Sequence, residues 1–445
     1  MKIYLGIDLG STTTKAVILN ARREIVGLGI TNSRSNYDVA CRVAKEQAMK
    51  NARFSFLEEE AKTAGLLEND AGRHTLIRLA SHFELATYLD QLEHLTGLSR
   101  ELARGYGVRA MRPVVEKAVD EICAGLLEGA RGLFLDETRQ RSDFFRDIAG
   151  SQYLELAETI ARREGVSFES LMSIWDRAIL IVEASAKESL FETMIGRALE
   201  LLAESAEGRD LALALAPIVE KVTRTELEED ALVGTGYGRQ TLPFSKECIR
   251  SEILCHGLGA NALFPGTATV LDIGGQDTKA IQVDPNGLVT NFQMNDRCAA
   301  GCGRYLGYIA DEMNMGLHEL GPMALEAKTP VRINSTCTVF AGAEIRERLA
   351  VGQRREDILG GLHRAIILRA MSLLARSGGI RDEFTFTGGV AKNPAAVKAL
   401  KELIHENYGE VTINIHPDSI YTGALGAALF ARESKNSLQP VEMTS

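Results

Sequence analysis

Apolar and polar positions follow a strand-like pattern in two stretches of the chain that share one order of residues. Residues 3–19 read as a strand, a tight turn and a second strand, with Asp8 at the end of the first strand. Residues 269–281 repeat this order, and Asp272 takes the place of Asp8. Because strand, Asp, glycine-containing turn, Thr, Lys and strand recur, the pattern predicts an internally duplicated fold in which the two acids are equivalent.

The chain between these stretches has a helical pattern instead. Residues of about 52–229 are rich in Ala, Leu, Glu and Arg and poor in β-branched runs, and a further helical segment covers 37–57. We expect helices over 76–96, 113–128, 152–164 and 173–204, with breaks near glycines such as Gly97 and Gly129. The expected organisation is 1–51, a helical insertion over 52–229, a second folded part over 230–433 and a flexible tail over 434–445.

The turn after Asp8 has the composition of a phosphate-binding hairpin. Its glycine, hydroxyls and lysine can surround phosphate oxygens, and Asp8 can hold Mg²⁺ through water; they are Gly10, Ser11, Thr12, Thr13 and Lys15. The stretch is no Walker A loop, since its spacing differs and no helix follows directly. One such turn could equally be a plain polar β-turn, and its repetition at Gly274 and Gly275 favours a phosphate clamp.

Two later segments complete this pattern. Residues 384–393 form a strand that runs into Gly388 and Gly389, and Pro394 opens a helix over 395–408. Paired glycines at such a junction let a flat ring approach the backbone closely. The last helix, 423–431, consists of small residues and is expected to pack tightly under a nucleotide.

Two cysteines precede helical patterns in runs of small residues. Cys298 lies before the apolar periodicity of 305–313, and Cys337 lies before that of 343–349. A helix N-terminus favours a thiolate, so both would suit an iron–sulfur cluster, although two thiolates are half of the usual four. Two structural cysteines in tight turns are the alternative.

Composition narrows the function classes. The 445 residues are enough for two or three domains. A net charge of −10 and a pI of about 5.5 argue against nucleic-acid or anionic-membrane partners. Seven scattered cysteines do not read as a disulfide framework. We see no signal-peptide or membrane-helix pattern and expect a cytoplasmic protein.

In this order, the motifs DLGSTTTK, DIGGQDTK, MNDRCAAGCGR, NSTCTVFA and TGGVAKN resemble those of the ATP-driven activators of 2-hydroxyacyl-CoA dehydratases and benzoyl-CoA reductases. The resemblance covers roughly residues 1–51 and 230–432. It implies an α/β fold, namely the duplicated actin/Hsp70-like (ASKHA) ATPase fold with a large, mainly helical insertion.

The resemblance also implies a site that uses ATP and Mg²⁺. Catalytic roles fall to Asp8, Asp272 and Gln276. Nucleotide contacts fall to Gly10, Ser11, Thr12, Thr13, Lys15, Gly274, Gly275, Asp277, Gly388, Gly389, Val390, Lys392 and Asn393. Cys298 and Cys337 match the ligands of a [4Fe–4S] cluster shared with a homologous subunit. Cys302 departs from the small hydroxyl residue of that motif and is expected near the cluster without binding it.

The insertion separates the candidate functions within this resemblance. Dehydratase activators are compact, whereas the large ATPase subunit of ATP-dependent benzoyl-CoA reductase carries a comparable insertion, so that subunit is the best match. It implies a smaller homologous ATPase subunit, two substrate-reducing subunits that bind an aromatic acyl-CoA, and reduced ferredoxin as donor. ATP hydrolysis would change the angle between domains and push a low-potential electron onward.

Other functions stay open from the sequence. One is an activator of a 2-hydroxyacyl-CoA dehydratase or of a double-cubane-cluster reductase. Another is a small-molecule kinase of the same superfamily, which would need a catalytic base and have no use for Cys298 and Cys337. A third is a chaperone-like or filament-forming ATPase. Iron in the anaerobically purified protein would argue against the last two.

Overall fold

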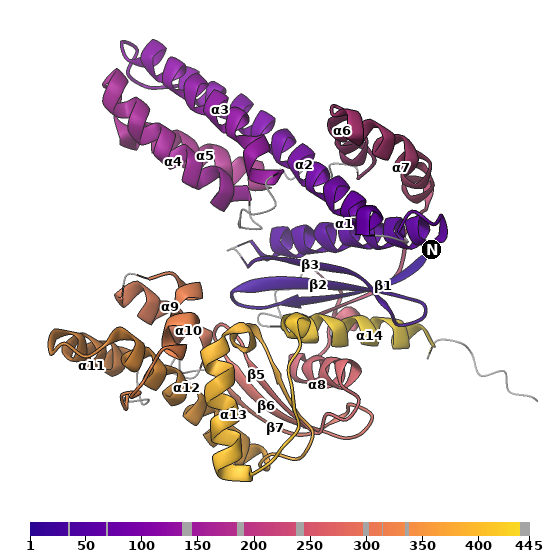
Figure 1. Cartoon of the computed structure of the whole chain (residues 1–445), viewed down its shortest axis with the longest axis vertical. Coiled ribbons are helices and arrows are strands. Elements are labelled where there is room, and N and C mark those ends of the chain that lie inside the picture. The colour runs from indigo at the N-terminus through magenta and orange to yellow at the C-terminus, as the bar shows by residue number, and fades with distance from the viewer. Residues whose placement is uncertain are drawn as a thin grey trace, which may run out of the picture. The chain divides into compact units, whose positions relative to one another are not determined.

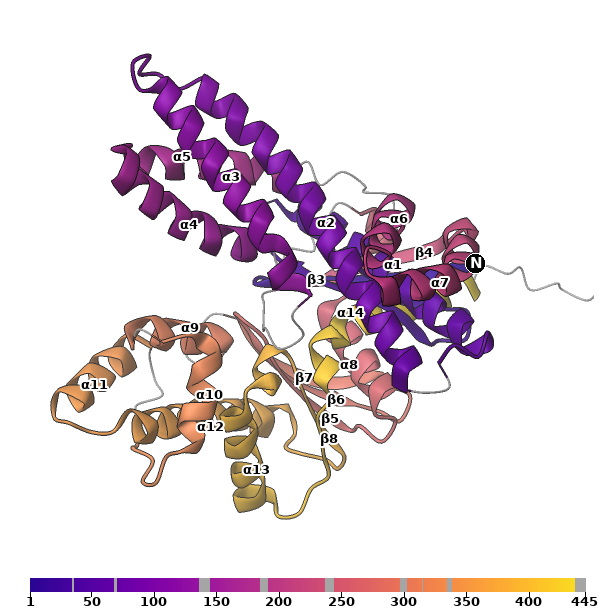
Figure 2. The ribbon, with the colours of Figure 1, turned by 45° about the horizontal axis from the view of Figure 1, so that its top comes forward.

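The chain folds into two compact units, shown in Figures 1 and 2. The computed structural model describes residues 1–33, 36–67, 70–135, 145–184, 191–236, 244–296, 302–313, 315–333 and 338–436. The first unit joins Met1–Ala52 to Leu227–Ser445, and the second is Arg53–Glu226. The boundaries expected from the sequence were 52 and 229.

The first unit contains two sheets of the same design. The first has the order β3-β2-β1-β4, with β1 Lys2–Leu9, β2 Thr13–Asn20, β3 Ile25–Asn32 and β4 Glu228–Gly236. The second has the order β7-β6-β5-β8-β9, with β5 Thr269–Ile273, β6 Thr278–Val283, β7 Val289–Asn295, β8 Phe384–Thr387 and β9 Ile413–Asn414. In each sheet the central strand pairs antiparallel with the following strand and parallel with a strand far along the chain.

Strand register shows the duplication residue by residue. Asp8 faces Lys15 on β2 and Thr235 on β4. Asp272 faces Lys279 on β6 and Thr387 on β8. The predicted duplicated fold is therefore confirmed, and the two acids close equivalent strands.

Helices of the first unit cover these sheets. They are the first part of α1 Tyr37–Thr63, then α8 Glu252–Leu263, α9 Gly303–Glu312, α10 Leu317–Leu325, α11 Thr338–Ala350, α12 Arg355–Ser377, α13 Pro394–Tyr408 and α14 Thr422–Asn436. Neighbouring strand residues point to opposite faces. Val270 joins the apolar cluster of α8, and Leu271 joins that of α12 and α13. The second sheet is thus buried on both faces.

The helix α14 lies very close to β1. A β-carbon at Gly6 would lie 2.0 Å from the carbonyl oxygen of Ala424, so only glycine fits there. Val17 and Leu19 of β2 share an apolar cluster with Ala424, Leu425, Ala428 and Leu429 of this helix. In Figure 1 the first sheet lies between the start of α1 and α14.

The helix α12 is the only one among the described residues that is long and apolar enough to span a membrane by length and composition. In the structure 67% of its apolar window is buried. Its side chains belong to the same apolar cluster as Phe384 and Phe386 of β8, as in a core helix.

The second unit is helical and has apolar cores of its own. It holds the end of α1, α2 Asp70–Arg104, α3 Arg112–Phe134, α4 Phe145–Glu164, α5 Phe168–Ala184, α6 Phe191–Leu202 and α7 Ala206–Arg224. In one core the rings of Tyr153 and Trp175 lie 4.8 Å apart. At the ends of the unit, Arg53 Nη1 donates to the carbonyl oxygens of Val222 (2.8 Å) and Thr225 (3.2 Å).

Three expectations for this unit are wrong. The helix α2 continues through Gly97 and α3 continues through Gly129. One glycine costs a helix only about 1 kcal/mol, which packing offsets; at Gly129 a β-carbon would lie 3.0 Å from Gln152 of α4. The single helix expected over 173–204 is two, since α5 ends at Ala184 and α6 begins at Phe191.

Candidate functional site

Asp8 closes β1 and is 2% exposed. Its Oδ2 lies 3.3 Å from Lys15 Nζ. Its Oδ1 makes no hydrogen bond within the described part of the chain. Leaving a buried acceptor unsatisfied costs about 1–3 kcal/mol, and more for a charged group. This oxygen is therefore suited to a cation or to water held by one.

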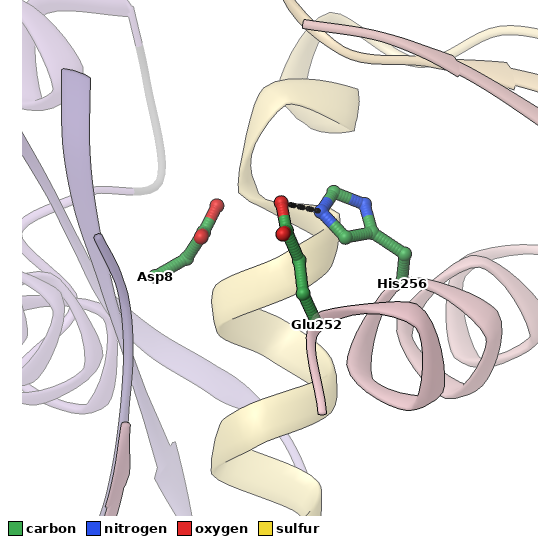
Figure 3. A group of neighbouring side chains, drawn as sticks. All are labelled: Asp8, Glu252 and His256. Carbon is green, nitrogen blue, oxygen red and sulfur yellow. Dashed lines mark ion pairs between the residues drawn. The ribbon is translucent and has the colours of Figure 1, made fainter. Parts of the chain in front are cut away.

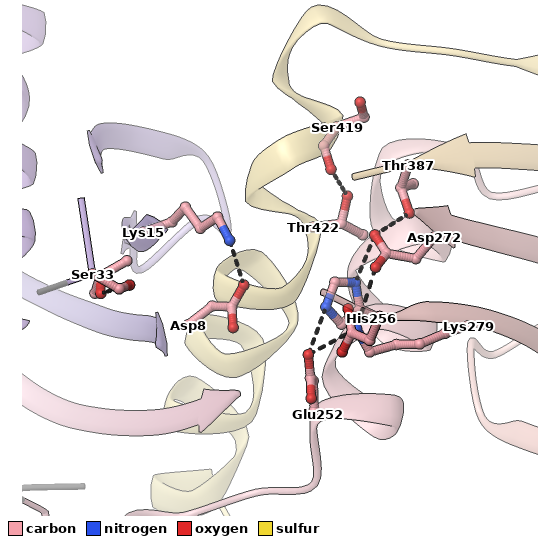
Figure 4. A network of polar contacts seen from close by, with 12 residues as sticks. Asp8, Lys15, Ser33, Glu252, His256, Asp272, Lys279, Thr387, Ser419 and Thr422 are labelled. Atoms are coloured by element: carbon pink, nitrogen blue, oxygen red, sulfur yellow. Dashed lines mark hydrogen bonds and ion pairs between the residues drawn. The ribbon is translucent and has the colours of Figure 1, made fainter. Parts of the chain in front are cut away.

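Asp272 takes the equivalent place in the second sheet, as Figure 4 shows. Its Oδ2 lies 3.3 Å from Lys279 Nζ, and its Oδ1 accepts a 2.9 Å hydrogen bond from Thr387. Burial acts to raise the pKa of Asp272, but His256, Lys279 and this hydrogen bond outweigh it and lower the pKa to about 2. Asp272 is thus held as a carboxylate.

The two lysines of the hairpins differ in their surroundings. Lys279 is buried and also contacts Glu252 Oε1 at 2.9 Å and Asp277 Oδ2 at 2.8 Å. Burial acts to lower the pKa of Lys279, but the three carboxylates raise it well above 10.5. The side chain of Lys15 is 12% exposed and has one carboxylate partner, Asp8, among the described residues. Lys15 therefore keeps donors for a ligand, whereas the carboxylates around Lys279 occupy its donors.

The helix α8 adds two side chains that sequence analysis missed. His256 Nδ1 lies 3.5 Å from Asp272 Oδ1, and His256 Nε2 lies 3.8 Å from Glu252 Oε1. Burial is the main cause that raises the pKa of Glu252. Figure 3 shows Asp8, Glu252 and His256 pointing toward one another. The i,i+4 spacing of Glu252 and His256, which places both on one helix face, was the available signal.

The two hairpin turns have the same geometry and touch each other. The amide of Gly10 donates to the carbonyl of Thr13 (3.2 Å), and that of Gly274 donates to the carbonyl of Asp277 (3.0 Å). A β-carbon at Gly275 would lie 2.1 Å from Thr12 Oγ1. The structure therefore brings the predicted phosphate-binding turns together. Ser11 and Gln276 are half-buried there.

The third predicted segment lies beside the second turn. Gly388 is buried with φ of +87°, and a β-carbon there would lie 2.4 Å from the carbonyl oxygen of Ile273. Gly389 is exposed, and a β-carbon there would meet no atom of the described residues within 4 Å. This backbone is accessible to a flat ring. Val390 is buried and Lys392 is exposed.

Asn393 has a structural role here. Its Oδ1 accepts hydrogen bonds from the amides of Ala395 and Ala396 at the start of α13. Its Nδ2 lies 3.0 Å from His363 Nε2. The predicted nucleotide residue is thus an N-cap of α13.

The predicted cluster ligands Cys298 and Cys337 lie outside the described residues. The helices that follow them are described, since α9 begins at Gly303 and α11 at Thr338. The first amides of α9 donate to the second hairpin turn, Gly303 to the carbonyl of Gly274 (2.8 Å) and Arg304 to that of Gly275 (2.7 Å). Cys302 is buried as the N-cap residue of α9.

This arrangement has the chemistry of a nucleotide site. Two buried acids, a ligand-facing lysine and two glycine-containing turns converge from the two sheets. Carboxylate oxygens are the donors that Mg²⁺ prefers, and Asp8 Oδ1 has no hydrogen-bond partner within the described residues, so the donor set fits such an ion.

Comparison with known proteins identifies relatives. Residues 5–431 match the BadF/BadG/BcrA/BcrD ATPase family. The (R)-2-hydroxyglutaryl-CoA dehydratase activating ATPase of Acidaminococcus fermentans is 40% identical over 49% of this chain and 82% of its own length. The 2-hydroxyisocaproyl-CoA dehydratase activator of Clostridioides difficile is 41% identical over 47% and 77%. One subunit of the benzoyl-CoA reductase of Thauera aromatica is 36% identical over 39% and 62%.

Solved structures agree on the fold. The Acidaminococcus fermentans (R)-2-hydroxyglutaryl-CoA dehydratase component A superposes with a TM-score of 0.54 at 23% identity, covering 98% of this chain and all of that one. The Clostridium difficile 2-hydroxyisocaproyl-CoA dehydratase activator with bound ADPNP gives 0.53 at 23%, with 99% of each chain covered. The expected actin-like fold is confirmed, and the chain belongs to the BadF/BadG/BcrA/BcrD ATPase family.

Proposed function

We propose that this chain hydrolyses ATP to drive low-potential electrons into a partner enzyme that acts on an acyl-CoA. The observation that carries the proposal is the pair of hairpins, in which Asp8 and Asp272 are buried and the turns at Thr12 and Gly275 touch. In a kinase the same hairpins would serve phosphoryl transfer. The relatives that are dehydratase activators or reductase subunits favour electron transfer.

In this proposal the two turns hold the phosphates of ATP. Ser11, Thr12, Thr13, Lys15, Gly274 and Gly275 offer hydroxyls, an ammonium and amides to the phosphate oxygens. Asp8 and Asp272 hold Mg²⁺ through water, and Gln276 orients the attacking water. The exposed backbone at Gly389 receives the adenine ring.

Cys298 and Cys337 would each give one thiolate to a [4Fe–4S] cluster, and a homologous subunit would give the other two. When bound, that cluster would supply a one-electron carrier of low potential. Hydrogen bonds from Gly303 and Arg304 tie α9, which follows Cys298, to the carbonyls of Gly274 and Gly275. A change of the turn on hydrolysis would therefore move the start of α9.

Two partner enzymes have specific support. Identities of 40% and 41% to dehydratase activators favour a 2-hydroxyacyl-CoA dehydratase. The helical unit Arg53–Glu226 favours a benzoyl-CoA reductase, with a smaller homologous ATPase subunit, substrate-reducing subunits for an aromatic acyl-CoA and reduced ferredoxin as donor.

Anaerobic purification of the untagged protein with its bound subunits tests the proposal. We expect bound iron, ATP hydrolysis and, with a reductant, electron transfer that stops when ATP is omitted. Cys298→Ser and Cys337→Ser should lose the iron, whereas Cys248→Ser, outside both motifs, should retain it. Iron-free protein that phosphorylates a small molecule would show a kinase instead. The masses of the bound subunits decide between dehydratase and reductase.

A further inference from the structure

The side chains of Asp8, Glu252 and His256 form a compact donor group that no phosphate contact explains. All three are buried, and one donor atom of each lies within 4.8 Å of the other two. They come from β1 and from one face of α8, and Figure 3 shows them pointing toward a common point. Two donors on one ion at about 2.1 Å are at most about 4.2 Å apart, so small side-chain movements suffice to bind one.

Two buried polar atoms here make no hydrogen bond to the described residues. They are Asp8 Oδ1 and His256 Nδ1, on residues that are 2% and 5% exposed. Burying such groups without partners is costly, so folds keep them where something binds. The unpartnered Asp8 oxygen thus supports a ligand independently of the clustering of acids.

Charge also requires a cation at this point. Asp8, Glu252, Asp272 and Asp277 bring four carboxylates, and Lys15 and Lys279 are the lysines that contact them within the described ranges. With all four carboxylates ionised and His256 neutral, two negative charges are left over. A buried excess of this kind is stabilised by a divalent ion.

Space for the ion is preserved by a glycine. A β-carbon at Gly423 would lie 2.9 Å from His256 Nε2 and 3.0 Å from Asp8 Oδ2. Any other residue at the start of α14 would therefore fill the gap between the imidazole and the carboxylate.

We propose that Asp8, Glu252 and His256 form a protein-held site for a divalent cation, and that the imidazole makes it prefer Mn²⁺ over Mg²⁺. Mg²⁺ takes oxygen donors, whereas nitrogen donors suit first-row transition metals. His256 Nε2 is the donor, because Nδ1 faces Asp272. Only the use of the ion in hydrolysis rests on the proposed function; binding itself does not.

Electron paramagnetic resonance of Mn²⁺ added to the nucleotide-free, untagged full chain tests the site. We expect one Mn²⁺ per chain, with an affinity at least about tenfold above that for Mg²⁺ in competition, and electron spin echo modulation from a directly bound ¹⁴N. Protein grown on ¹⁵N-histidine should show the ¹⁵N pattern instead. This isotope test needs no variant and so does not depend on whether a variant folds.

Variants assign the nitrogen. His256→Gln should remove the modulation and weaken Mn²⁺ binding about tenfold, since one ligand is lost. Gly423→Ala should weaken binding with His256 in place. His405→Gln, on the exposed surface of α13, should change neither. Absence of nitrogen modulation in the wild type, or its persistence in His256→Gln, would overturn the proposal.

Binding of labelled ATP and hydrolysis with Mg²⁺, measured on the same samples, separate the two proposals. ATP hydrolysis without a nitrogen-bound Mn²⁺ would refute the cation site alone. A nitrogen-bound Mn²⁺ in a protein that neither binds nor hydrolyses ATP would refute the proposed function alone.

Discussion

Asp272 and Lys279 face each other on adjacent antiparallel strands with 3.3 Å between Oδ2 and Nζ, and Asp8 and Lys15 repeat this pair at the same distance. The surroundings of the two pairs have diverged. Lys279 neutralises three buried carboxylates, whereas Lys15 is partly exposed beside one. One copy of the duplicated motif therefore serves mainly stability and the other mainly binding.

Replacing each lysine should separate these roles. Lys279→Ala leaves buried carboxylates without their cation, and breaking such a pair costs about 3–5 kcal/mol. Lys15→Ala should change the free energy of unfolding by less than about 1 kcal/mol, as partly exposed pairs contribute little, but weaken ATP binding. Urea unfolding and ATP titration of both variants measure this. Equal loss of stability in the two would contradict the division of roles.

Asp8→Asn should keep the fold and lose ATP hydrolysis by roughly 100-fold, because the orienting charge for metal and water is lost. The matched control is Asp418→Asn, whose side chain is 46% exposed at the start of η4 (Pro417–Tyr421). Hydrolysis rates at saturating ATP measure the effect. Unchanged turnover in Asp8→Asn would make the hairpin a structural turn.

Stability should fall in acid partly through Asp272. Its folded pKa is about 2, below the ordinary 3.8, so its ionised form stabilises the fold above pH 3.8 and this contribution is lost as pH falls toward 2. The contribution is about 2 kcal/mol. Urea unfolding between pH 6 and 3 should show a shallower pH dependence for Asp272→Asn than for the wild type. Identical slopes would mean that other groups cause the acid limb.

Gly303→Ala should uncouple hydrolysis from electron delivery. A β-carbon there would lie 3.1 Å from the Gly274 carbonyl oxygen and 3.3 Å from Val390 Cγ2, which pushes α9 off the turn. Electrons transferred per ATP should fall roughly tenfold while hydrolysis continues. Gly307→Ala, in the same helix with open space at its β-carbon, is the control. Full coupling in Gly303→Ala would show that these hydrogen bonds carry no signal.

Residues 53–226 should be removable without loss of the ATPase. The unit has its own apolar cores, and Arg53 holds its two ends together, so a short linker can replace it. We expect part of the ATP hydrolysis to remain while assembly with partner subunits fails, as judged by co-purification. Intact assembly and electron delivery would remove the main reason for favouring a benzoyl-CoA reductase.

Local sequence patterns predicted the parts of this structure that depend on local geometry. The acid–glycine turns at Asp8 and Asp272 and the Gly388 turn each need particular residues at fixed spacing, so the sequence shows them. Glu252 and His256 were missed because a helical acid and histidine acquire meaning only when tertiary packing brings them to Asp8 and Asp272. Helix breaks at Gly97 and Gly129 were wrong because helix packing outweighs the local cost of glycine. The roles of the remaining site residues stay predictions.

The close contact between Gly6 and α14 also bears on how the protein is made. The helix that completes the apolar cluster of β2 is encoded more than 400 residues after β1. At roughly 5–20 residues per second, the ribosome needs some 20–80 s to deliver it. During that time the first sheet exposes apolar surface, while residues 53–226 can already fold. The nascent chain should therefore be a chaperone client until residues 422–436 have emerged.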